Sequence, residues 1–175
     1  MLIVLSGLPG VGKTAIAREL ARRIGAVHLR IDSIEQAMRD SGTVNGSIKD
    51  AGYRAAYAIA EDNLRLGRTV IADSVNPIQL TRDAWRNVAT RANLPALEVE
   101  IRCSSVSEHR RRVEERTSDI AGLTLPTWDD VITREYAQWD RDHLVLDTSA
   151  LPLDDCVAAI QRALHPASPR SIPAD

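Results

Sequence analysis

The chain has 175 residues, a length typical of one compact domain, with 44% hydrophobic and 26% charged residues. These values are close to the globular average and exclude a disordered or fibrous chain. The net charge of -2 gives no broad basic footprint for nucleic acid. No stretch approaches the roughly 20 apolar residues that span a membrane. We therefore expect no membrane protein and no broad nucleic-acid-binding surface, although a narrow basic site is compatible with this charge.

Two cysteines, Cys103 and Cys156, are too few for a disulfide framework and lack the spacing of metal ligands. Such usage is typical of a reducing compartment. The apolar start, residues 1–5, is shorter than the apolar region of a secretory signal and has no basic residues before it. We therefore expect a cytoplasmic protein.

The elements alternate along the chain. The pattern predicts a strand at 2–6, a helix at 14–24, a strand at 26–31 and a helix to residue 38 with Asp32 and Ser33 as caps. A polar excursion at 40–50 leads to a helix at 53–66 that Gly67 ends, a strand at 69–73, and a helix that Pro77 opens and that runs to about 91. We then expect a strand at 96–103, helices at 107–115 and about 129–139, a strand at 144–148 and a helix at 153–164.

This alternation, with nearly continuous apolar strands, indicates a parallel sheet covered on both faces, an α/β/α three-layer sandwich. One domain spans 1–164, with a lid at about 117–127, and we expect the proline-rich tail 165–175 to be disordered. Ligands of such sheets bind at the carboxyl ends of the strands.

One glycine-rich loop matches the phosphate-loop pattern G-x-x-x-x-G-K-[ST] in full and lies between a predicted strand and a predicted helix. Its backbone N–H groups and the following helix dipole favour a polyphosphate. Lys13 is expected to bind the β- and γ-phosphates of ATP and Thr14 to ligate Mg²⁺. The loop consists of Gly7, Leu8, Pro9, Gly10, Val11, Gly12, Lys13 and Thr14.

A rival interpretation uses the same segment. Gly10, Gly12 and Ala15 also fit G-x-G-x-x-A, with Asp32 about 20 residues further on, as in dinucleotide-binding oxidoreductases. Lys13 and Thr14 are not part of that fingerprint, so they favour phosphoryl transfer.

Polar side chains follow the second and third strands. Asp32 is a candidate catalytic base for a substrate hydroxyl, with a helix N-cap as the compatible alternative. Asp73 is a candidate Mg²⁺ ligand and substrate contact, with a plain cap or turn role as the alternative. Asn76 and Arg82 are candidate substrate-binding residues, although a solvated surface arginine is equally compatible with the sequence.

A basic helix precedes the lid. Arg112 and Arg116 are four residues apart, so we expect them on one helix face, where they could clamp phosphates or contact adenine as the lid closes. The alternative is a solvated face with Glu–Arg pairs.

On these motifs the chain resembles the P-loop kinases of the nucleoside-monophosphate-kinase-like superfamily over residues 1 to about 164. The run L-R-I-D-S at 29–33 is most similar to chloramphenicol phosphotransferases and related ATP-binding small-molecule kinases. The resemblance implies sheet order 2-3-1-4-5, MgATP as cofactor, Asp32 as base, lid arginines Arg112 and Arg116, and a loop at Thr148 passing under adenine.

Departures from related families narrow the prediction. The chain lacks the D-x-D after strand two and the triple glycine after strand three of shikimate kinases, and its neutral charge disfavours a polynucleotide 5′-hydroxyl kinase. We expect a monomeric or homodimeric kinase that phosphorylates a small-molecule alcohol. The alternative class is a nucleotide-dependent switch that hydrolyses ATP without an acceptor.

Overall fold

The structure is a computed structural model in which residues 1–42 and 48–165 are described. The central part of the predicted polar excursion, 43–47, and the predicted disordered tail beyond residue 165 lie outside the described residues.

Five parallel strands form one sheet, which confirms the predicted fold class and strand order. The order across the sheet is β2-β3-β1-β4-β5, and each neighbouring pair is parallel. β1 is buried along its whole length because it lies in the middle of the sheet with helices on both faces. The strands are β1 (Leu2–Ser6), β2 (Val27–Arg30), β3 (Val70–Asp73), β4 (Ala96–Arg102) and β5 (Leu144–Asp147).

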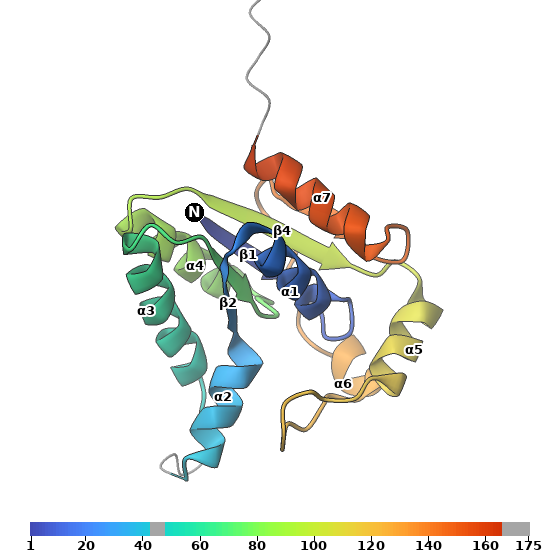
Figure 1. Ribbon diagram of the computed structural model, residues 1–175. Helices are drawn as coiled ribbons and strands as arrows, with labels where there is room; N and C mark the ends of the chain where they lie inside the picture. Colours follow the sequence, from blue (N-terminus) through green and yellow to red (C-terminus); the bar gives the residue numbers. More distant parts are fainter. Residues whose placement is uncertain (43–47, 166–175) are drawn as a thin grey trace, which may run out of the picture.

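Helices cover both faces of this sheet and extend beyond its carboxyl edge (Figure 1). Ile3 and Leu5 of β1 pack with α1 and α7, whereas Leu2 and Val4 pack with α3 and α4. This alternation follows from the two-residue period of a strand and divides the core into two layers. The helices are α1 (Lys13–Ile24), α2 (Ile31–Asp40), α3 (Ala51–Arg65), α4 (Gln79–Arg91), α5 (Val106–Glu115), α6 (Trp128–Ile132) and α7 (Leu153–Leu164).

The carboxyl end of the sheet carries the segments expected to hold a ligand. In Figure 1, α2, α5, α6 and the segment between α5 and α6 all lie beyond the strand ends on that side. Since β1 leads into the phosphate loop and β2 leads directly into α2, both segments are held at one edge by the sheet itself. The fold thus places the candidate site at the predicted edge.

The predicted helix over 129–139 is wrong beyond Ile132, where α6 ends. The backbone of the following segment is bonded elsewhere. Ala137 donates its N–H to the carbonyl of Pro77 at 2.8 Å, and its own carbonyl accepts from Arg82 at 2.8 Å. These long-range hydrogen bonds use the groups that an eleven-residue helix would need, so tertiary contacts override the local pattern.

Two predicted helix starts also differ. α2 begins at Ile31 with Arg30 at the N-cap and no side-chain cap hydrogen bond, so Asp32 and Ser33 lie in the first turn and are not its caps. α4 begins at Gln79, two residues after Pro77. In both cases the helix begins at a different residue from the one that capping preferences alone predict.

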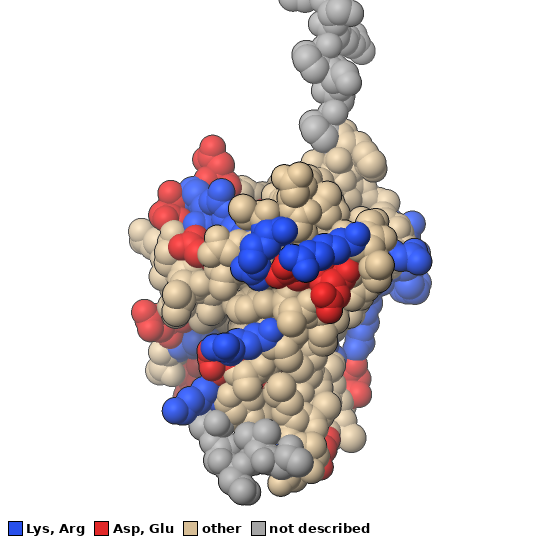
Figure 2. Space-filling model, turned by 90° about the vertical axis from the view of Figure 1, so that its left-hand side faces the viewer, with Lys and Arg blue, Asp and Glu red and all other residues tan. Residues whose placement is uncertain are grey.

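Basic and acidic side chains are interspersed on the face shown in Figure 2, where the described residues form no continuous stripe of one sign. Among the helices of the described ranges, none is long and apolar enough to cross a bilayer.

Candidate active site

The phosphate loop has a backbone that only glycine permits at its first position. Gly7 has φ of +141°, and a Cβ there would lie 2.2 Å from the carbonyl oxygen of Ile101. The Gly7 N–H donates to the carbonyl of Val75 at 3.0 Å. Gly7 is thus in contact with β4 on one side and with the segment after β3 on the other. These contacts fix the start of the phosphate loop within the protein itself.

α5 supports the middle of the loop. A Cβ on Gly10 would lie 2.5 Å from Cγ2 of Val113, so the loop and helix are in close contact there. Nε2 of the buried His109 lies 2.8 Å from the carbonyl oxygen of Pro9, an acceptor, and therefore donates to it. The helix that carries Arg112 is in this way tied directly to the phosphate loop.

Thr148 connects the phosphate loop to α5 by hydrogen bonds to both. Its hydroxyl donates to the carbonyl of Val11 at 2.8 Å. Arg112 donates to the Thr148 hydroxyl at 2.8 Å and to its carbonyl at 3.0 Å. The structure therefore brings Thr148 and Arg112, both expected near the nucleotide, against the phosphate loop.

Lys13 is buried in the loop and donates from Nζ to the carbonyl of Leu8 at 2.9 Å. Burial lowers the pKa of Lys13 to about 8, although the charges of Asp73 and Asp32 act in the opposite direction. A buried ammonium bonded to one neutral carbonyl is ready to exchange that partner for an anionic oxygen, which would stabilise its charged form.

Asp73 ends β3 beside the loop and is 3% exposed. Burial alone would raise its pKa, but hydrogen bonds from His28 and Thr14 and the charge of Lys13 outweigh it, so the pKa of Asp73 is lowered. Nε2 of His28 lies 3.1 Å from the carboxylate. Asp73 and Thr14, the two expected Mg²⁺ ligands, are thus neighbours.

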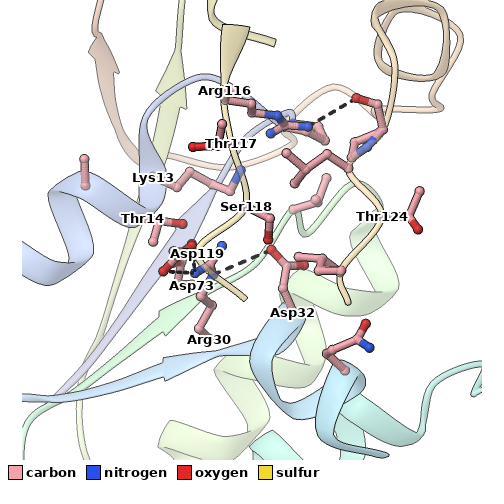
Figure 3. Close-up of a pocket in the computed structure, with 18 of the residues that line it drawn as sticks. Lys13, Thr14, Arg30, Asp32, Asp73, Arg116, Thr117, Ser118, Asp119 and Thr124 are labelled. Atoms are coloured by element: carbon pink, nitrogen blue, oxygen red, sulfur yellow. Dashed lines mark hydrogen bonds and ion pairs between the residues drawn. The ribbon is translucent and has the colours of Figure 1, made fainter. Parts of the chain in front are cut away.

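Asp32 projects from the first turn of α2 toward the same region (Figure 3). Its side chain is 55% exposed, and its Oδ2 lies 3.7 Å from Nε of Arg30. The carboxylate is therefore accessible to a ligand and flanked by a cation.

A cavity of about 990 Å³ joins these groups. It is lined by the phosphate loop, α1, α2, the strand ends and the segment 117–126, and its size is at the upper end of the usual range for small-molecule sites. The sequence-predicted residues that line it are Pro9, Gly10, Gly12, Lys13, Thr14, Asp32, Asp73, Arg112 and Arg116.

Arg116 reaches the cavity from a different place than predicted. α5 ends at Glu115, and Arg116 continues in an extended conformation, so it does not share a helix face with Arg112. Its Nη2 donates to the carbonyl of Pro126 at 3.3 Å, whereas its buried Nε has no hydrogen-bond partner among the described residues. Burial lowers the pKa of Arg116; Asp32 opposes this shift and the charge of Arg30 adds to it.

Asn76 and Arg82, the predicted substrate-binding residues, are not among the residues that line the cavity. Both are fully buried. The Asn76 amide donates to the carbonyl of Leu5 at 3.0 Å and accepts from the indole N–H of Trp85 at 3.1 Å. Arg82 donates from Nε to the carbonyl of Asn76 at 3.0 Å and stacks 4.2 Å from the ring centre of Trp139. Their polar groups hold the loop after β3 in place.

We predict that Asn76→Ala lowers the free energy of unfolding by about 3 kcal/mol, because Trp85 Nε1 loses its partner in the core. Urea unfolding measures this. Asn93→Ala is the matched control, since Asn93 also has a positive φ of 54° but is exposed. Unchanged stability of Asn76→Ala together with a raised KM for an acceptor would restore the substrate-binding role.

Several cavity residues were not found from the sequence. Arg18, Arg30, Asp119 and Arg134 line the cavity, and His28 contacts Asp73 behind it. Arg30 was visible as a charged residue at the end of an apolar strand, a signal like the one that found Asp32. Nothing in the local pattern distinguishes Arg18 or Asp119 from solvated surface residues.

The profile of the AAA domain family matches residues 2–134, most of the chain, so the chain belongs to this family. Three uncharacterized mycobacterial proteins are similar to it, among them one from Mycobacterium tuberculosis that is 28% identical over 157 residues. The match covers 82% of this chain and 31% of that protein, so the chain spans about a third of the length of these curated relatives.

Solved structures show the same fold at low sequence identity. The Mycobacterium tuberculosis APS kinase CysC in complex with AMPPNP and APS has a TM-score of 0.69 at 19% identity, covering 93% of this chain and 96% of its own. Chaetomium thermophilum Kti12 in complex with ADP-AlF3 has a TM-score of 0.67 at 24% identity, covering 93% and 98%. A Sinorhizobium meliloti gluconokinase has a TM-score of 0.60 at 19% identity, covering 93% and 94%. The fold is that of the P-loop kinases.

Proposed function

We propose that the protein is an ATP- and Mg²⁺-dependent phosphotransferase that moves the γ-phosphate of ATP to a hydroxyl group of a small molecule. One observation carries this proposal: Lys13 of the phosphate loop and the exposed carboxylate of Asp32 line a single cavity beneath a lid. In-line phosphoryl transfer needs the attacking hydroxyl opposite the leaving oxygen, a cation on the transferred phosphate and little water, and Asp32 and Lys13 would act on the hydroxyl and on the phosphate respectively.

The residues around the loop fit a bound nucleotide. The backbone of residues 7–14 and the amino end of α1 would receive the phosphates, with Lys13 on the β- and γ-phosphates. Arg112 and Thr148, already packed on the loop, are the candidates for the remainder of the nucleotide. Bound MgATP supplies the transferable phosphoryl group and a cation that neutralises its charge.

The donor set also fits Mg²⁺. The Thr14 hydroxyl is hydrogen-bonded to the Asp73 carboxylate, so two oxygen ligands lie side by side next to Lys13. Mg²⁺ typically takes one or two protein oxygens and completes its octahedral shell with phosphate oxygens and water. Thr14 and Asp73 therefore suffice on the protein side.

Asp32 would accept the proton of the acceptor hydroxyl, and Arg116 would stabilise negative charge that develops on the transferred group. The free Nε of Arg116 is a donor without a partner in the described part of the chain, and a phosphate oxygen would satisfy it. Each step thus uses a group that is already in the cavity.

The proposal is tested by incubating the protein with MgATP and a panel of hydroxyl compounds and measuring products by mass spectrometry. A kinase adds the mass of one phosphate group to an acceptor and releases ADP. Release of ADP and phosphate without any phosphorylated product would indicate a nucleotide switch. Thermal stabilisation by NAD in place of MgATP would indicate a dinucleotide-binding protein.

A further inference from the structure

The carboxylate of Asp119, in the predicted lid, forms ion pairs with two arginines that line the cavity. Asp119 accepts from Nη1 of Arg30 with both oxygens, at 2.8 and 3.1 Å, and also pairs with Arg18 of α1. Arg18 belongs to α1 and Arg30 ends β2, whereas Asp119 lies 89 residues after Arg30, between α5 and α6. Both hydrogen bonds from Arg30 come from the same guanidinium nitrogen, so the carboxylate is held by charge-assisted hydrogen bonds and leaves the Nε of Arg30 without a partner among the described residues.

Arg30 is the more buried of the two arginines, with its side chain 13% exposed. It lies next to Asp32, the proposed base, rather than on the phosphate loop or α5. Its Nε is buried and has no hydrogen-bond partner in the described ranges, and Asp32 is 3.7 Å away, beyond hydrogen-bond distance. The guanidinium of Arg30 is therefore held in place, keeps one unpaired N–H donor among the described residues, and lies beside Asp32, where the acceptor is expected to bind.

The charge of the cavity wall is opposite to that of the whole chain. Among the described residues, eight lysine and arginine side chains line it against five aspartates and glutamates, although the chain carries a net charge of -2. Arg116 lies close enough to Arg30 for their charges to repel, and Asp32 lies near both. The anion that lies between Arg30 and Arg18, which is Asp119 in this structure, offsets part of this repulsion.

We propose that Arg18 and Arg30 form an anion-binding subsite for the acceptor, and that Asp119 occupies it until the acceptor arrives. This inference rests on the proposed kinase function and specifies its substrate class: an alcohol that also carries a carboxylate, sulfate or phosphate group. The anionic group of the acceptor replaces the Asp119 carboxylate on Arg30, and its hydroxyl is presented to Asp32. Asp119 is then free to leave with the lid.

The subsite is tested with inorganic sulfate as the probe. Sulfate is titrated by calorimetry into protein saturated with Mg-AMPPNP, so that the phosphate loop is already filled. Arg30→Gln is expected to weaken sulfate binding about tenfold, and Asp119→Asn to strengthen it by a similar factor, because one removes a charged donor and the other removes the competing carboxylate. Arg22→Gln, on an exposed part of α1 outside the cavity, should change nothing.

Two results of this titration would overturn the inference. One is a sulfate affinity of the nucleotide-saturated protein that is the same in wild type, Arg30→Gln and Asp119→Asn, or no detectable sulfate binding in any of them. The other is a loss of Mg-AMPPNP affinity in Arg30→Gln with unchanged sulfate binding, which would assign Arg30 to the nucleotide.

A second arm separates this inference from the proposed function. Aldonates and the alditols of the same carbon chain are offered as acceptors with MgATP. We expect wild type to phosphorylate the anionic member of each pair preferentially, and Arg30→Gln to lose that preference through KM. Equal phosphorylation of both members would refute the subsite and leave the kinase function intact. Arg30-dependent sulfate binding without phosphorylation of any alcohol would refute the kinase function and support the anion site alone.

Discussion

Replacing Lys13 with glutamine is expected to lower the rate of phosphoryl transfer by about 10²- to 10³-fold. The side chain is buried in the phosphate loop, and its hydrogen-bond partner among the described residues is the neutral carbonyl of Leu8. Glutamine can keep that contact but offers no charge to the transferred phosphate. Single-turnover kinetics with saturating MgATP measure the effect on chemistry. A rate within a few-fold of wild type would exclude Lys13 from the reaction.

The same residue predicts a pH dependence. Because the pKa of Lys13 in the folded protein is lowered to about 8, the free protein loses this proton above pH 8, whereas bound phosphates favour the charged form. MgATP affinity should therefore be flat below pH 8 and fall above it, with proton uptake on binding near pH 8. Lys13→Gln should remove this dependence. Affinity that rises between pH 8 and 9 would contradict the assignment.

The lowered pKa of Lys13 also makes the free energy of unfolding depend on pH, in a direction that can be derived. The unfolded chain keeps its lysine proton up to the ordinary value of 10.5, whereas the folded protein releases it from about pH 8. Between these values the unfolded state binds more protons, so the contribution of Lys13 to folding stability increases with pH. The gain is complete above pH 10.5.

Asp32→Asn is expected to lower acceptor phosphorylation by about 10²- to 10⁴-fold while leaving MgATP affinity within about twofold. Asparagine has the same shape as aspartate but cannot accept a proton. The side chain is half exposed and pairs only loosely with Arg30, so the substitution should leave folding stability nearly unchanged.

The measurement for Asp32 is a pair of assays on one preparation: calorimetry with Mg-AMPPNP and the initial rate of acceptor phosphorylation. Asp62→Asn, an exposed aspartate on α3 outside the cavity, is the matched control. Equal phosphorylation by wild type and Asp32→Asn would remove the base from the proposed reaction. A parallel loss of nucleotide binding would assign Asp32 to the nucleotide.

The parts of the site that follow local rules were predictable. The phosphate loop is a contiguous motif between a strand and a helix, and Asp73 ends an apolar strand, so neighbouring residues alone determine where both lie. The sheet could be predicted for the same reason, because each of its strands is an apolar run followed by a helical pattern.

The remainder depends on contacts between distant residues. Arg82 looks like a surface arginine in the sequence, yet it is fully buried and bonded to carbonyls 55 and 56 residues away. Those bonds also explain why the predicted helix over 129–139 stops early. The pairing of Asp119 with Arg30 spans 89 residues and leaves no periodic trace that sequence analysis could detect.

In the proposed reaction, the phosphate loop holds the triphosphate of ATP while Asp32 faces the incoming alcohol. A crystal structure with Mg-AMPPNP tests this arrangement most directly. We expect Nζ of Lys13 to leave the carbonyl of Leu8 for the β- and γ-phosphates, with Thr14 at the metal and Asp32 directed at the γ-phosphate. A nucleotide bound outside residues 7–14, or Asp32 turned away from the γ-phosphate, would contradict the account.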